Sequence, residues 1–204
     1  MITVRKSCKL HRPTAILAAL VIAFSQLLEI FAVISNPVYS LYWLTNGFDI
    51  LISVLLVVVL FRSRKDVFAG IVFLLPAMVS LLSMFYDLFS ICFTVGMQGY
   101  LLMRTLVHLL VAIFHTLAAL ECFDASRISA GAGRIFLWLL PLLSFDCALA
   151  EQMILSINSG MLIDEAVFGS TVYTVPQWLG PILMGVALAI RTHKQAEYTE
   201  KGAV

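Results

Sequence analysis

Charged residues are scarce in this chain. They make up 12% of its 204 residues, while hydrophobic residues make up 61%. A typical soluble domain carries about 25% charged residues, so this chain has too little polar surface to cover a water-soluble globule. The mean hydropathy of +1.00 and the long apolar runs indicate a protein that crosses a membrane several times.

The patterns of common catalytic sites are absent from the sequence. It contains no G-x-S-x-G, H-E-x-x-H, DDxxD, C-x-x-C or P-loop pattern. The four cysteines are far apart, and we interpret them as small apolar residues rather than disulfide partners. Nothing in the sequence therefore points to an enzyme or to a cofactor, although an intramembrane enzyme stays open as the least favoured class.

The sequence also lacks the patterns of a metal site and of a nucleic acid-binding surface. His108 and His115 lie seven residues apart, which is about 10 Å along a helix, and two ligands of one zinc ion each lie about 2.1 Å from it. The other two histidines are near the chain ends. We expect no metal site, and no basic cluster with interleaved aromatic residues suggests a nucleic acid partner.

Long apolar runs predict an all-α, polytopic bundle of six transmembrane helices in a single integral-membrane domain, residues 1–204. A bilayer core about 30 Å thick needs about 20 apolar residues per span. The first run is too long for the apolar region of a cleaved signal peptide, about 7–15 residues, so we expect it to be retained. The expected spans are 14–34, 41–61, 67–90, 100–120, 134–157 and 170–190, with a polar tail at 191–204.

Lysine and arginine fall almost entirely on one side of these spans. Of the 13 basic residues, only Arg104 lies toward the other side. Cytoplasmic loops are enriched in Lys and Arg, so we expect both termini in the cytoplasm and the protein in the cell membrane, with the lipid bilayer as its first partner.

Polar side chains recur in the outer half of the spans. Steps of four and eleven residues rotate a helix by about 40° and 20°, so Arg104, His108 and His115 lie on one stripe of their span. Charged groups inside a bilayer usually face the bundle interior. We therefore expect a polar binding pocket formed by Glu29, Asp49, Arg104, His108, Asp146, Glu151 and Gln177.

The charges of these residues do not balance. Together with Asp87, five carboxylates face one arginine, and this surplus suggests a small cationic ligand, water or bound protons. Arg104 is expected to pair with Asp49 or Asp146, and such pairs could equally serve helix packing alone. Asp87 is expected near the headgroups.

Small residues mark a second feature, on the first span. Ala15, Ala19 and Ala23 are spaced four apart, a stripe on which another helix can approach closely. The partner is either a neighbouring span or a membrane partner subunit. Six spans, this length and this stripe resemble the substrate-binding subunits of energy-coupling-factor vitamin transporters, whose first helix contacts the coupling subunit. The chain departs from that family in lacking an obvious long first outer loop.

Two main function classes follow from these features. One is a binding or transport subunit for a small cationic solute. The other is a non-transporting membrane protein with an assembly, immunity or regulatory role, since many small polytopic proteins carry no sharper signal. Co-purification of an ATPase and a coupling subunit would favour the first class, and unaltered solute uptake in a deletion strain would favour the second.

The predicted threading can be tested with topology reporters. Fusions at Ser63, at Ser129 and at the C-terminus should read cytoplasmic, and a fusion at Ser159 should read external, because the basic residues flank the first three sites. An external signal from any of the first three would contradict the six-span arrangement.

Overall fold

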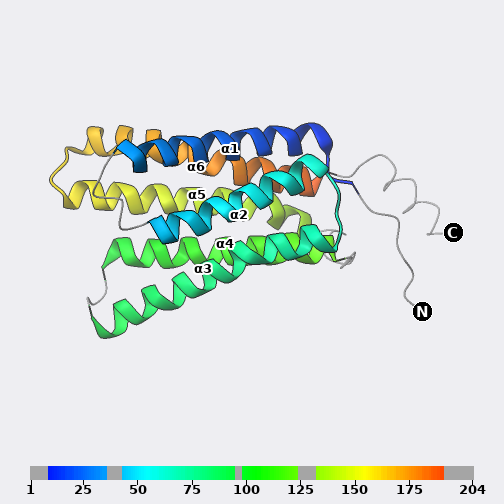
Figure 1. The fold of residues 1–204 in the computed structure, drawn as a ribbon. Coiled ribbons are helices and arrows are strands. Elements are labelled where there is room, and N and C mark those ends of the chain that lie inside the picture. Colours follow the sequence, from blue (N-terminus) through cyan, green and yellow to red (C-terminus); the bar gives the residue numbers. More distant parts are fainter. Residues whose placement is uncertain (1–8, 36–42, 95–97, 124–131, 191–204) are drawn as a thin grey trace.

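A computed structural model describes residues 9–35, 43–94, 98–123 and 132–190. Within these ranges it has six α-helices that run side by side along one long axis (Figure 1). They are α1 Arg12–Ser35, α2 Trp43–Arg62, α3 Val67–Phe93, α4 Gly99–Cys122, α5 Ala132–Asn158 and α6 Ile163–Ala189.

The helices have the length and composition of membrane spans. Four of them, α1, α3, α4 and α5, are each long and apolar enough to cross a bilayer, and α6 is a fifth if its bent halves are counted together. The protein is thus an all-helical membrane protein with several apolar helices. Helix α6 begins seven residues earlier than the predicted span. Asp164 and Glu165 lie in its first turn, where negative side chains stabilise the positive N-terminal end of the helix dipole.

The helices pack in a ring that follows the order of the chain. Each helix contacts the helices before and after it, and α1 closes the ring against α6. Of the consecutive pairs, α2 and α3 contact each other least. The ring is therefore loosest between α2 and α3.

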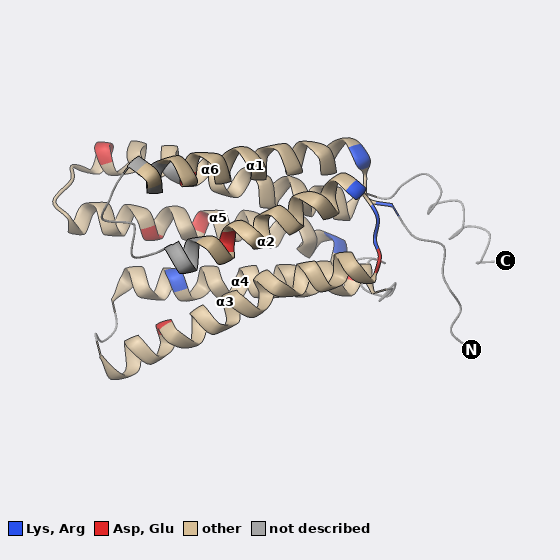
Figure 2. Ribbon diagram, viewed as in Figure 1, with Lys and Arg blue, Asp and Glu red and all other residues tan. Residues whose placement is uncertain are grey.

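The two ends of the bundle differ in charge. We call the end that holds the start of α1 and the end of α6 the basic end, because Lys9, Arg12, Arg62 and Arg134 lie there, and we call the opposite end the outer end (Figure 2). Arg104 is the one basic residue in the outer half among the described residues.

The packed core fills the half of the bundle nearer the basic end. Phe73, Leu60, Phe114, Leu137 and Met184, from five different helices, are at most 2% exposed and belong to one hydrophobic cluster. In the outer half of the described helices, by contrast, polar residues such as Asp87, Thr105 and Thr174 are buried among apolar ones such as Leu101 and Ala148. The packing thus closes one end of the ring and leaves the other end looser.

A buried ion pair and backbone hydrogen bonds join the helix ends at the basic end. The Lys65 ammonium lies 2.6 Å from a Glu121 carboxylate oxygen, and both side chains are less than 10% exposed. Lys65 also donates to the Leu188 carbonyl, while the backbone N–H of Leu10 donates to Ser63 and that of His11 to Ala187. These bonds connect the ends of α1, α2, α4 and α6.

The alanine stripe of α1 packs inside the bundle. Ala15 and Ala19 are 0% exposed, and Ala23 is partly buried. The contacts of α1 are with α2 and α6, so small side chains here permit close approach of neighbouring helices. Of the two partners that the sequence left open, the stripe meets a neighbouring span, and its two buried alanines are not accessible to a partner subunit.

Glycines on α6 allow the closest helix contacts. A Cβ atom at Gly185 would lie 2.1 Å from the Leu137 carbonyl oxygen of α5, and one at Gly180 would lie 2.5 Å from the Ile22 side chain of α1. The first clash involves backbone, which no side-chain rotation relieves. Glycine at position 185 therefore sets the distance between α5 and α6.

We predict that Gly185→Ala lowers the free energy of unfolding by about 1–3 kcal/mol, the usual cost of overpacking. The matched control is Gly169→Ala on the same helix, where an added Cβ meets no atom within 4 Å and alanine favours the helix. Unfolding of both variants in detergent, followed by circular dichroism, measures the difference. Equal stability of the two variants would contradict the close contact between α5 and α6.

Candidate functional site

Each helix has an inward-facing stripe that is apolar near the basic end and polar in the outer half. Residues seven apart lie on the same side of a helix. On α1, the stripe runs from buried Ala15 through buried Ile22 to half-buried Glu29. On α5 it runs from Leu137 through Ser144, both 0% exposed, to half-buried Glu151.

The other four helices repeat this pattern with different side chains. On α2, Asp49 follows buried Leu56 along the stripe, and on α6 Gln177 follows buried Met184; both polar residues are exposed. On α3 the stripe ends at Asp87, and on α4 it carries Arg104, His108 and His115. The structure brings most of these polar residues together in two groups. One comprises Asp87, Arg104, His108 and Glu151 on α3, α4 and α5, and the other comprises Gln26, Glu29 and Asp49 on α1 and α2.

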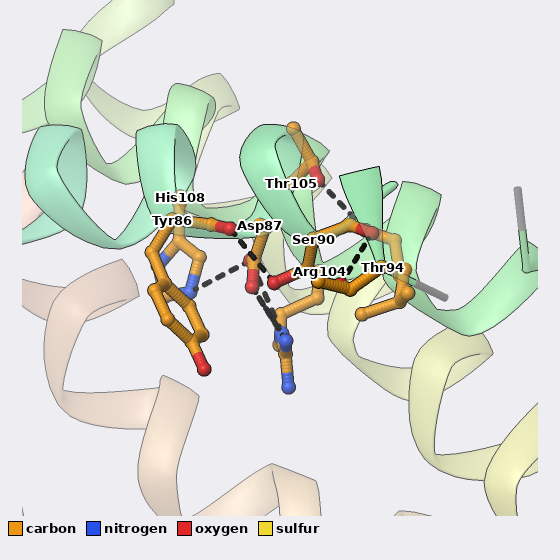
Figure 3. A network of polar contacts seen from close by, with 8 residues as sticks. Tyr86, Asp87, Ser90, Thr94, Arg104, Thr105 and His108 are labelled. Carbon is orange, nitrogen blue, oxygen red and sulfur yellow. Dashed lines mark hydrogen bonds and ion pairs between the residues drawn. The ribbon is translucent and has the colours of Figure 1, made fainter. Parts of the chain in front are cut away.

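An ion pair between α3 and α4 is the centre of this polar region (Figure 3). The Arg104 guanidinium binds both carboxylate oxygens of Asp87, with Nε 3.0 Å from Oδ1 and 3.1 Å from Oδ2, and its Nη2 also contacts Oδ1. The Nε2 atom of His108 lies 3.5 Å from Oδ2 of the same carboxylate. Asp87 is therefore held from two sides.

Burial differs among the three residues. The Asp87 side chain is 2% exposed, whereas the side chains of Arg104 and His108 are 36% and 28% exposed. A buried carboxylate is costly without a partner, so Asp87 depends on Arg104. Arg104 in turn keeps part of its guanidinium open to the adjacent cavity.

That cavity has a volume of about 420 Å³ and lies along the junction of α3 and α4. Its lining comprises Leu82, Ser83, Tyr86, Asp87, Arg104 and His108. Leu82 and Tyr86 are 68% and 69% exposed, and they lie on α3 in the outer half. The cavity is therefore open rather than enclosed. Asp87 and Arg104 form its charged part, and Leu82 and Tyr86 form its apolar edge.

Glu151 adds a second carboxylate near this ion pair. It lies close enough for its charge to interact with those of Arg104 and Asp87, yet it forms no ion pair among the described residues. Arg104 therefore interacts at short range with Asp87 and at longer range with Glu151.

Glu29 and Asp49 form a second acidic group, on α1 and α2. Their charges lie close enough to interact, and the Gln26 side-chain amide donates to Glu29 at 3.2 Å. The other polar atom of Gln26, Oε1, is buried and has no hydrogen-bond partner among the described residues. No lysine or arginine occurs in the sequence from Pro13 to Phe61, so α1 and α2 supply no basic partner.

The structure changes the partner predicted for Arg104. The sequence analysis named Asp49 or Asp146, and the ion pair is instead with Asp87. Helices α3 and α4 are consecutive and antiparallel, and Asp87 and Arg104 each lie within about two turns of their connection. Equal distance from a short connection was the signal that could have identified this pair.

Asp146 is also placed differently from the prediction. It lies on α5 one turn from Leu142, and both are exposed, on the side of the helix opposite buried Ser144. The predicted pocket residue therefore lies on the outer surface of the ring. The span prediction could not give the direction of its side chain, because the sequence does not say which neighbours cover α5.

His115 shares the stripe of Arg104 but belongs to the core. It is 6% exposed, and its Nδ1 lies 3.0 Å from the Val111 carbonyl one turn earlier on α4. The ring of Phe114 meets it edge-on at 4.9 Å between ring centres. Its Nδ1 atom is thus satisfied within its own helix, and the buried ring is not part of the candidate site.

Among the described residues, no cluster of three His, Cys, Asp or Glu has a geometry that could hold a metal ion. Comparison of the chain with protein-family models, curated proteins and solved structures gives no match.

We predict that Arg104→Leu lowers the free energy of unfolding by about 1–3 kcal/mol, because it leaves the buried Asp87 carboxylate unpaired. Adding Asp87→Leu should recover part of that loss. A double-mutant cycle measured by unfolding in detergent gives the coupling energy directly.

The control is Arg104→Leu combined with Asp146→Leu, whose effects should simply add, since the structure places Asp146 away from Arg104. Coupling to Asp146 rather than to Asp87 would contradict the observed ion pair.

Proposed function

We propose that this protein binds a small cationic solute in the polar interior of its outer half, as a binding or transport subunit of the membrane. The observation that supports this proposal most is the surplus of carboxylates that face inward. Glu29, Asp49 and Glu151 face the interior of the ring, and the single basic residue of that half, Arg104, is already bound to Asp87.

An unpaired charge within a bilayer has a high free-energy cost. Ionised side chains there face an interior or a watered cavity and pair with one another or with a ligand. Three carboxylates without a basic partner need a proton, water or a cation to offset their charge. A solute with an amine or another compact positive charge fits this requirement.

The ring supports entry from the outer side. The core is closed near the basic end, and the polar stripes lie toward the outer end. The cavity lies between α3 and α4, and its edge is formed by exposed Leu82 and Tyr86. A cationic solute could therefore reach the acids without crossing the packed core.

The proposal includes the topology inferred from the sequence. We propose six spans, with α2 as one of them, and both termini in the cytoplasm. The alternation of the helices between the two ends of the bundle (Figure 1) and the grouping of basic residues at one end (Figure 2) support this arrangement, because Lys and Arg favour the cytoplasmic side.

Cation binding is tested by thermal unfolding of the purified protein with a panel of amines, quaternary ammonium compounds and metal ions. At least one cation should raise the unfolding temperature, and the increase should grow between about pH 5 and 8. The sign follows from competition, since protons and cations bind the same carboxylates. Protonated His108 would repel a cation and would act in the same direction.

Glu29→Gln and Asp49→Asn should each reduce the increase, because they remove charge and keep side-chain size. The matched control is Asp146→Asn, an acid outside the ring interior, which should leave the increase unchanged. The proposal fails if no cation stabilises the protein, or if the two site variants respond like the control.

A further inference from the structure

Asp146 occupies an unusual position for a charged residue in a membrane helix. It lies near the middle of α5, twelve residues before the helix ends at Asn158. Its side chain is exposed, and Ile135, Trp138 and Leu142 on the same side of the helix are also exposed, at 52%, 42% and 37%. The carboxylate thus stands in an apolar surface on the outside of the ring.

A carboxylate at this position has few ways to reach water. Asn158 lies about 18 Å away along the helix axis at 1.5 Å per residue, and the short side chain of aspartate cannot extend that far. Charged residues within membrane spans almost always face the bundle interior or a water-filled cavity. Among the acids of the described helices that lie away from the helix ends, Asp146 is the one on the side opposite the buried residues of its helix.

Exposure alone does not distinguish Asp146, because Asp49 is exposed as well. The two differ in direction. Asp49 lies on the same side of α2 as buried Ile52 and Leu56, toward the interior of the ring, whereas Asp146 lies on the side of α5 opposite buried Ser144. Solute or water inside the ring can therefore reach the Asp49 carboxylate. The Asp146 carboxylate, on the other side of its helix, is out of reach of that solute or water.

We propose that this face of α5 docks a transmembrane helix of a second membrane protein, and that a lysine or arginine near the middle of that helix pairs with Asp146. Polar pairing across helices is a recognised driving force of association within lipid. The surrounding Ile135, Trp138 and Leu142 would provide the apolar contact surface around the pair.

Charge complementarity favours a different protein over a second copy of this chain. A symmetric pair of copies would place Asp146 opposite an equivalent carboxylate. Within the part of the chain that the structure describes, the one basic residue in the outer half is Arg104, which binds Asp87. Two copies therefore offer no basic group to this surface.

The test uses synthetic single-span helices made mainly of leucine, with lysine, glutamine or leucine at the central position. Each is incorporated with the full-length labelled protein into phosphatidylcholine vesicles, and association is followed by energy transfer. The lysine peptide should associate about tenfold more tightly than the leucine peptide, a difference of about 1.4 kcal/mol. Asp146→Asn should remove that difference.

The control variant is Asp164→Asn, which makes the same chemical change at an exposed acid in the first turn of α6; it should keep the preference for lysine. Equal association of the lysine and glutamine peptides would overturn the charge pairing. Energy transfer between two labelled copies of the protein that is lost in Asp146→Asn would show a self-association surface instead. No association with any peptide would also overturn the proposal.

Discussion

An ionised side chain within a bilayer requires a partner or water, and this requirement explains the main features of the protein. The paired charges of the outer half, Asp87 and Arg104, join consecutive helices with His108 beside them. The remaining carboxylates that face inward, Glu29, Asp49 and Glu151, keep the outer half of the ring polar. The same requirement makes the outward-facing Asp146 a candidate contact with another protein.

Packing and polarity divide the bundle along its axis. Near the basic end, Ala15, Ala19 and Gly185 bring helices into close contact, and Lys65 with Glu121 joins their ends. Close packing leaves no room for solute there. Toward the outer end the small residues give way to charged ones such as Asp87 and Arg104.

The sequence predicted the helical class correctly, and the predicted binding pocket stays a prediction. Long apolar runs and helical periodicity indicated a membrane bundle, and the structure brings Arg104 and His108, two of the predicted residues, together beside Asp87. The partner of Arg104 was misassigned, because depth was estimated for each span separately and the short connection between α3 and α4 was not used to align Asp87 with it. The direction of Asp146 was misassigned because periodicity relates residues within one helix only.

The sequence by itself determined which segments are helical and apolar, where the basic residues fall, and that the outer half contains more acids than bases. These properties depend on composition and spacing along one chain. Only the tertiary structure decided that Asp87 is the partner of Arg104, that the alanine stripe meets a neighbouring helix and that Asp146 faces outward. Those outcomes depend on how each helix is rotated against its neighbours, and close contacts such as Gly185 with Leu137 fix that rotation.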